Sequence, residues 1–196
     1  MVKKKVVKKT AAKKITKKTA KKSAKKPAKD STPVKKASSV AGIPNSGALA
    51  PEFILPASMQ GEIDLASYRG KKNVVLYFYP KDDTPGCTTE ACSFRDHYDR
   101  ILKTGTIVIG ISPDPVKKHD RFIEKYSLQF PLASDEQNTV AKKYGVWVEK
   151  SMYGRTYMGI QRATFLINKS GKIAAAWPKV KVDGHTDEVL AAITRL

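Results

Sequence analysis

The sequence predicts an α/β sandwich, and three observations support this fold class. Two apolar runs of strand length, residues 74–79 and 106–111, are continuous and therefore typical of strands buried on both faces of a sheet. A helical pattern follows each run, over 87–103 and over 116–126. A pair of strands joined by a turn and a last helical segment complete the chain.

The remaining elements can be placed from their turns and end signals. We expect a short strand at 53–55, a polar hairpin region at 59–65, a short helix at 139–144 that ends at Gly145, strands at 164–167 and 172–177 around a turn at 168–171, and a terminal helix at 186–196. Strand, helix, strand, helix, hairpin and helix in this order fit a thioredoxin-like sandwich, with a central mixed sheet flanked by helices.

Charge divides the chain into three parts. Residues 1–50 hold 16 lysines, no arginine and one acid, which gives +15 and leaves +4 of the total of +19 for the other 146 residues. We expect residues 1–36 to be a disordered lysine-rich tail, residues 37–50 a linker rich in Ala, Ser and Gly, and residues 51–196 one domain.

The tail is built around paired lysines that recur every four residues. These are Lys13, Lys14, Lys17, Lys18, Lys21, Lys22, Lys25 and Lys26. Lysine contacts to phosphate release counterions and give affinity without sequence preference, so non-specific DNA binding is the function that we favour for the tail. A dispensable extension that adds solubility and a tail bound to an anionic membrane surface are the alternatives.

Several classes of protein are disfavoured. Two cysteines close in sequence do not make an extracellular disulfide framework. No apolar stretch approaches the ~20 residues that span a bilayer, and no apolar core follows the basic N-terminus as in a secretory signal. We expect a cytoplasmic protein, which the tail could associate with the nucleoid or nucleus.

Cys87 is the strongest functional candidate. It lies in the segment Pro80-Lys81-Asp82-Asp83-Thr84-Pro85-Gly86-Cys87, between the first apolar run and the helical pattern that follows it. Thr84 suits the cap of that helix and Pro85 its first turn. The N-terminus of a helix favours an anion, and the thiolate is the reactive form of cysteine. We therefore expect a redox site at Cys87.

This segment resembles the active-site loop of the peroxiredoxins, and the resemblance is closest to the Q type, or bacterioferritin comigratory protein, subgroup. Pro80, Thr84 and Cys87 match the family signature, and Cys92 matches the second cysteine of the subgroup. Residues 158–167 resemble the stretch that carries the family's active-site arginine, here Arg162. The resemblance covers residues 51–196 and implies the thioredoxin-like fold.

The resemblance also implies a function. Cys87 would be the peroxidatic cysteine, Thr84 would hydrogen-bond the peroxide, Arg162 would stabilise the thiolate and the leaving oxygen, and Pro80 would shield the thiol from water. The substrates would be hydrogen peroxide and organic hydroperoxides, the reductant would be thioredoxin or a similar dithiol, and no metal, haem or flavin cofactor is needed. Two cysteines in one chain allow a monomer to complete the cycle.

Cys92 would resolve the sulfenic acid that forms on Cys87. In a continuous helix, residues five apart are separated by ~7.5 Å along the axis, whereas a disulfide needs Cα atoms within ~7 Å and converging side chains. We therefore predict that residues 87–94 unwind on oxidation. If Cys92 is instead a small buried hydrophobe, a partner thiol would resolve Cys87.

Other functions remain open at this point. A thiol–disulfide oxidoreductase, a DNA-shielding protein with a structural domain and a redox switch for a partner are each compatible with parts of the sequence. We expect Glu90 to stabilise the first helical turn rather than to act in catalysis, and His97, His119 and His185 to lie on the surface. Tyr153, Tyr157 and Met158 could line a peroxide pocket or simply pack.

Overall fold

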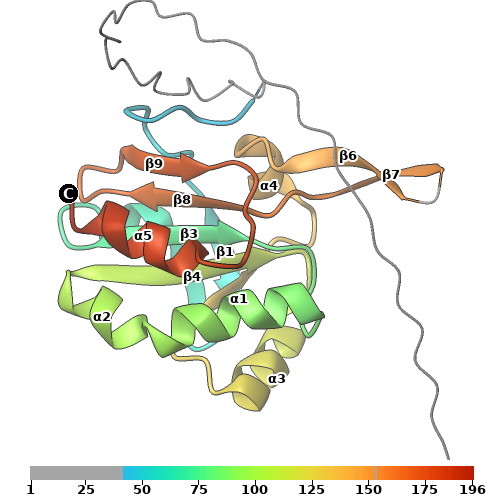
Figure 1. Ribbon diagram of the computed structural model, residues 1–196, viewed down its shortest axis with the longest axis horizontal. Helices are drawn as coiled ribbons and strands as arrows, with labels where there is room; N and C mark the ends of the chain where they lie inside the picture. The colour runs from blue at the N-terminus through green and yellow to red at the C-terminus, as the bar shows by residue number, and fades with distance from the viewer. Residues whose placement is uncertain (1–41, 153) are drawn as a thin grey trace, which may run out of the picture. The chain divides into compact units, whose positions relative to one another are not determined.

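The computed structural model describes residues 42–152 and 154–196, and within them the predicted α/β architecture is confirmed (Figure 1). Seven of the described strands form one mixed sheet in the order β2-β1-β5-β4-β3-β8-β9, and β6 and β7 form a separate hairpin. The strands are Ile54–Ala57 (β1), Gly61–Asp64 (β2), Asn73–Phe78 (β3), Thr106–Ser112 (β4), Leu132–Ser134 (β5), Trp147–Met152 (β6), Arg155–Ile160 (β7), Ala163–Ile167 (β8) and Ile173–Trp177 (β9).

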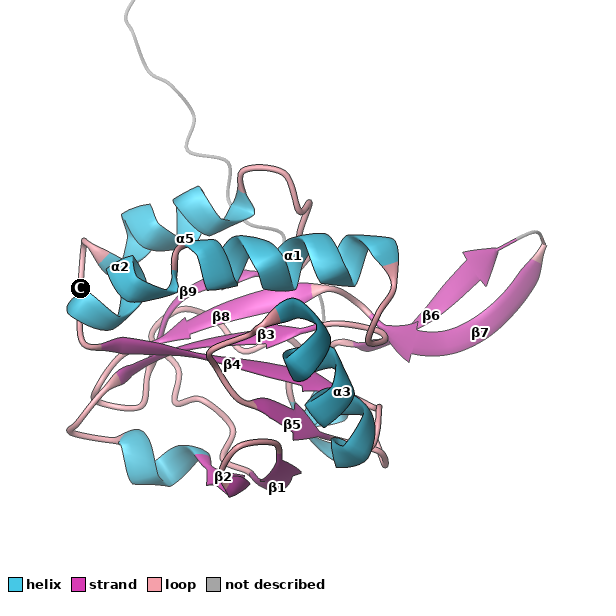
Figure 2. Cartoon of the chain, turned by 90° about the horizontal axis from the view of Figure 1, so that it is seen from below, coloured by secondary structure: helices cyan, strands magenta, loops and turns pink. Residues whose placement is uncertain are grey.

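Helices cover both faces of the sheet. They are the 3-10 helix Leu65–Tyr68 (η1) and the α-helices Pro85–Asp96 (α1), Tyr98–Lys103 (α2), Val116–Tyr126 (α3), Thr139–Lys143 (α4) and His185–Ile193 (α5). Figure 2 shows α1, α2 and α5 together on one side of the strands. None of the helices in the described part of the chain has the length and apolar character needed to cross a membrane.

Strand β3 is buried on both faces, as its continuous apolar run predicts. Val75 and Tyr77 face the core under α1, α2, α3 and α5, whereas Leu76 and Phe78 face the core under α4. A fully buried apolar side chain contributes roughly 1.5–3 kcal/mol, so this strand ties both layers to one rigid element. The loop that follows it therefore starts from a fixed position.

The strands on either side of β3 determine which residues lie next to the loop that follows it. Strand β4 pairs with β3 in parallel, and β8 pairs with it antiparallel, so that Phe78 lies opposite Ala163. Because β8 runs the other way, the residues just before Ala163 reach the same edge of the sheet as the residues just after Phe78. The register thus brings Arg162 to the loop that begins after β3.

The helix predicted over 87–103 differs from the structure in two ways. It begins at Pro85, and it is interrupted at His97, which separates α1 from α2. Nδ1 of His97 lies 2.9 Å from the carbonyl oxygen of Ser93, the acceptor that a continuous helix would use for the His97 backbone N–H. A side chain that competes for a backbone acceptor weakens a helix at that point.

Strand β5 and the β6–β7 hairpin were not predicted. Strand β5 has only three residues, and β6 and β7 mix apolar with polar side chains around a turn in which Gly154 has a φ of +75°. A three-residue strand is too short to show periodicity, and the hairpin lacks the regular alternation that identifies strands. Figure 1 shows the hairpin pointing away from the main sheet.

The prediction that the histidines lie on the surface is wrong for two of the three. His119 and His185 are buried, and His97 is half-buried. The buried rings have partners from distant segments, since His119 lies 2.7 Å from a carboxylate oxygen of Asp82 and His185 lies 2.8 Å from the hydroxyl of Thr164. Burial, reinforced by the positive charge of Arg162, lowers the pKa of His185 to about 4.

The end of the predicted linker is attached to the sheet. The backbone N–H of Gly47 donates to the carbonyl of Ile173 at 2.7 Å, and Ala50 is buried. Residues 46–50 therefore extend the domain beyond the predicted boundary at 51. The predicted lysine tail, residues 1–36, and Tyr153 lie outside the described residues.

Candidate active site

The turn between β3 and α1 carries the predicted redox site. Thr84 occupies the N-cap position with an extended backbone, and Pro85 is the first helical residue, as predicted. The Thr84 carbonyl accepts the Thr88 backbone N–H at 2.8 Å. The prediction that the Thr84 side chain caps the helix is wrong, because its hydroxyl donates instead to the carbonyl of Lys81 at 3.1 Å. This hydroxyl therefore closes the turn rather than the helix end.

Cys87 is in the first turn of α1 and its side chain is 1% exposed. It packs in the core layer that also contains Tyr77, Ala91 and Phe94. Nη2 of Arg162 lies 3.2 Å from the Cys87 sulfur. Arg162 comes from the link between β7 and β8, 75 residues away in sequence. The structure therefore brings together the two residues to which the sequence assigned the nucleophile and the permanent positive charge.

Glu90 completes this group of side chains, and the sequence analysis missed its role. It lies in the second turn of α1, is 1% exposed and forms an ion pair with Nη1 of Arg162. The expectation that it stabilises the first helical turn is therefore wrong. Burial raises the pKa of Glu90 to about 7, although the charge of Arg162 opposes this shift. Arg162 thus bridges a thiol and a carboxyl that titrates near neutral pH.

Gly86 leaves room for the guanidinium. A Cβ atom on Gly86 would lie 3.3 Å from Nη2 of Arg162, which is tighter than an ordinary contact. The backbone carbonyl of Arg162 also accepts from the Val180 backbone N–H at 3.1 Å, and this hydrogen bond fixes its main chain.

Cys92 is half-buried, and both cysteines are free thiols. One continuous helix, α1, contains both of them. Residues five apart in a helix are ~7.5 Å apart along its axis and point in different directions, so a disulfide cannot form in this conformation. The structure is that of the reduced form, and the two cysteines are not brought together in it.

Two of the residues that could line a peroxide pocket lie on β7. Tyr157 and Met158 are exposed on β7. Lys150, on β6, was not considered, yet its ammonium donates to the carbonyl of Ile160 and its pKa is lowered by partial burial and by Arg162. Among the described residues, no three His, Cys, Asp or Glu side chains gather as metal ligands would.

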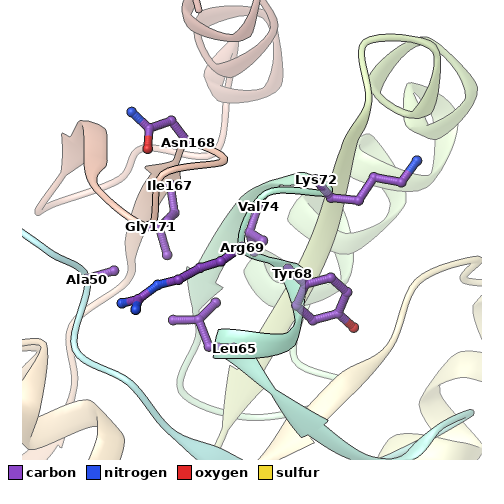
Figure 3. A pocket seen from close by; sticks show the side chains of 9 residues that line it. All are labelled: Ala50, Leu65, Tyr68, Arg69, Lys72, Val74, Ile167, Asn168 and Gly171. Atoms are coloured by element: carbon purple, nitrogen blue, oxygen red, sulfur yellow. The ribbon is translucent and has the colours of Figure 1, made fainter.

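One small hollow lies at the opposite end of β3, between the start of that strand and the turn after β8 (Figure 3). Arg69, Val74 and Gly171 are among its lining residues, and its volume of about 10 Å³ is enough for one water molecule. Arg69 is already paired with Glu52 at 2.7 Å. The hollow is separate from the cysteine site, because none of the residues of that site lines it.

Comparison with known proteins adds independent information. The AhpC/TSA family pattern matches residues 46–176. A protein of Coxiella burnetii named "Putative peroxiredoxin bcp" is 54% identical over 147 residues, which are 75% of this chain and 97% of that protein.

Solved structures agree with this match. A Xanthomonas campestris peroxiredoxin Q structure is 42% identical, has a TM-score of 0.69, and covers 73% of this chain and 90% of its own. A second structure of the same TM-score and coverage, 41% identical, is described as a Xanthomonas campestris bacterioferritin comigratory protein with alkyl peroxide reduction activity.

Proposed function

Since this chain belongs to the AhpC/TSA family and, within it, to the peroxiredoxins of the Bcp or Q type, it is a thiol-dependent peroxidase, and we propose that Cys87 is its peroxide-reactive residue. The observation that carries this proposal is the Arg162 guanidinium, 3.2 Å from the sulfur of a buried thiol. A fixed positive charge at this distance stabilises the negative charge that develops on the leaving oxygen.

The first step consumes the peroxide. The Cys87 thiolate attacks one peroxide oxygen, the O–O bond breaks, and the other oxygen leaves as water or an alcohol after taking up a proton. The sulfur is oxidised by two electrons to a sulfenic acid. Thr84 can turn its hydroxyl from Lys81 toward the peroxide, and Pro80 shapes the loop that excludes water.

The second step forms a disulfide. The Cys92 thiolate attacks the Cys87 sulfenic sulfur, and water leaves. Because α1 keeps the two residues apart, we propose that its first turns unwind before this step. A thioredoxin-like dithiol then reduces the disulfide through a mixed intermediate and returns both thiols. One chain suffices for this cycle, so we propose a monomer.

The substrates that we propose are hydrogen peroxide and organic hydroperoxides. The second class is supported by the alkyl peroxide reduction activity ascribed to the Xanthomonas campestris protein. Cumene hydroperoxide, which is larger than hydrogen peroxide, is the probe that tests this second class directly.

Intact mass and peptide mapping after one equivalent of hydrogen peroxide test the cycle. The reduced protein should lose two hydrogens, mapped to a link between Cys87 and Cys92 within one chain. Cys92→Ser should instead retain one oxygen on Cys87 or form a linked dimer, and Cys87→Ser should not change. An oxygen or a link that maps to Cys92 in the Cys87→Ser protein would overturn the assignment of the two roles.

The lysine-rich tail supports a second, separate proposal. Sixteen lysines and one acid in the first fifty residues give a net +15, and only +4 remains for the rest of the chain. A charge of this size seeks polyanions, and we propose that the tail binds DNA without sequence preference. It would then hold a cytoplasmic peroxidase close to the nucleoid.

A further inference from the structure

A buried network of three polar side chains lies beside the Cys87 loop. Asp82, in that loop, is 3% exposed, and both of its carboxylate oxygens have a partner. Oδ1 accepts from the Tyr79 hydroxyl at 2.7 Å, and Oδ2 lies 2.7 Å from Nδ1 of His119, on α3. His119 is completely buried. The network therefore joins β3, the loop and α3.

The backbone of the same loop is also fastened to this side of the molecule. The Asp82 N–H donates to a carboxylate oxygen of Asp114 at 2.6 Å, just before α3. The next residue, Asp83, has a φ of +59°, and its carboxylate accepts from Lys125 and from Tyr126. Asp83 directly precedes Thr84, so the start of α1 is positioned from α3.

A carboxylate and an imidazole are costly to bury, and apolar side chains of similar volume would serve the core as well. Packing alone therefore does not explain the network. Its hydrogen bonds are directional, so they fix the loop in one conformation. His119 uses only one of its two ring nitrogens, since Nε2 has no hydrogen-bond partner among the described residues. Its contribution is the contact between Nδ1 and Asp82.

We infer that His119 is a positioning residue for the reaction of Cys87 with peroxide. Through Asp82 it holds the turn that places Thr84 and the first turn of α1 where the peroxide meets the thiolate. This inference rests on the proposed role of Cys87. If His119 has this role, the two chemical steps depend on different segments. The loop before Cys87 must stay fixed while the thiolate reacts with peroxide, whereas the helix after Cys87 must unwind before the disulfide forms.

Rapid mixing of the reduced full chain with hydrogen peroxide measures the two steps separately. The second-order step is the oxidation of Cys87, and its rate constant is measured by competition with horseradish peroxidase for hydrogen peroxide. The first-order step is disulfide formation. We expect His119→Leu to lower the second-order rate constant by about 10- to 100-fold, as a small displacement of a reacting group does, and to leave disulfide formation no slower.

Two further variants make the test specific. His119→Asn carries an amide N–H near the place of Nδ1 and lacks a counterpart of Nε2, so it should restore most of the second-order rate constant. Asp120→Asn, an exposed neighbour on α3, should behave as the unmodified protein. General destabilisation would not be rescued by Asn and would not be confined to the first step.

If His119→Leu does not fold, Tyr79→Phe decides the question, because it removes only the hydroxyl that donates to Asp82. It should slow the same step and leave disulfide formation no slower. A folded His119→Leu, or in its absence Tyr79→Phe, that reacts with peroxide at the unmodified rate would overturn the inference. Lack of Cys87 oxidation in the unmodified protein would instead refute the proposed function.

Discussion

At the scale of single residues, the chemistry depends on how Arg162 divides its charge. One nitrogen of the guanidinium contacts the Cys87 sulfur, and another contacts the Glu90 carboxylate. A planar guanidinium can donate in both directions at once, whereas an ammonium is a compact point charge. The thiol and the carboxyl therefore compete for the same cation, and the protonation of Glu90 affects how much of it Cys87 receives.

Replacing Arg162 tests this division. Arg162→Lys keeps the charge but cannot bridge both partners, so we expect the second-order rate constant with hydrogen peroxide to fall about 10²- to 10³-fold, as on loss of an oxyanion donor. Arg155→Lys, at an exposed position on β7, is the matched control and should not change it. A fully active Arg162→Lys protein would show that charge alone is sufficient.

Glu90 should make stability depend on pH. Its pKa is raised from 4.5 to about 7, so the folded protein binds this proton more tightly than the unfolded chain. The free energy of unfolding should therefore fall as pH rises from about 5 to about 7. Relative to Glu90→Gln, the free energy of unfolding of the unmodified protein should fall by roughly 3 kcal/mol between pH 4 and pH 8. Urea unfolding at each pH measures it.

Other groups, including His185, contribute equally to the pH dependence of stability in the unmodified and Glu90→Gln proteins. Their contribution therefore cancels in the difference between the two. That histidine acts in the opposite direction, since its lowered pKa makes stability rise with pH between about 4 and about 6.5. Glu124→Gln, on the exposed face of α3, should leave the pH dependence as it is. Parallel curves for the unmodified and Glu90→Gln proteins would mean that folding does not change the pKa of Glu90.

The sequence was informative about reacting residues and uninformative about buried polar ones. Cys87 and Arg162 could be named because their types and spacing match a signature. Glu90 and His119 could not be placed, because a polar side chain is buried only when a partner arrives from a distant segment, here Arg162 or Asp82. Strand register and the packing of helices on the sheet determine which distant residues meet. The periodicity of a single sequence gives no information about either.

At the scale of elements, long and uniform patterns predicted well and short or polar ones did not. Strand β3 and helix α3 were found almost to the residue, because a continuous apolar run and a clear start signal identify them. The break at His97 was missed, since it depends on a ring that competes for the carbonyl of Ser93. The β6–β7 hairpin was missed because its apolar and polar side chains do not alternate regularly.

Helix α1 should change its conformation when the protein is oxidised. We expect amide hydrogens of residues 87–94 to lose protection in the disulfide form, because the link between Cys87 and Cys92 cannot form while that helix is intact. Helix α3 should keep its protection and serves as the internal control. Hydrogen exchange with mass spectrometry, read on peptides from α1 and α3, makes the measurement. Equal protection of α1 in both forms would contradict local unwinding.

At the scale of the whole molecule, charge and catalysis belong to different parts of the chain. All the residues of the cysteine site lie between Pro80 and Arg162, and the excess positive charge lies in the first fifty residues. The predicted linker between them would allow each part to act without the other. Deletion is therefore a clean way to separate the two proposals.

Deletion of residues 1–40 should abolish DNA binding and preserve peroxidase activity. Binding of the full chain to duplex DNA should weaken steeply with salt, with a slope of about −0.9 per phosphate contact. Changing the eight paired lysines to glutamine should reproduce the effect of the deletion without shortening the chain. Electrophoretic mobility shift at several salt concentrations measures the binding. Retained affinity in the truncated protein would place the DNA-binding surface in the domain.

The register of β3 against β8 has a consequence for the newly made protein. Cys87 is synthesised well before Arg162, which follows it by 75 residues, and only the antiparallel pairing of the two strands brings the guanidinium to the sulfur. Pairing between such distant segments forms late, after the local helices. A chain still emerging from the ribosome therefore lacks the contact between the guanidinium and the sulfur, and the complete cysteine site forms only once the two distant segments have paired.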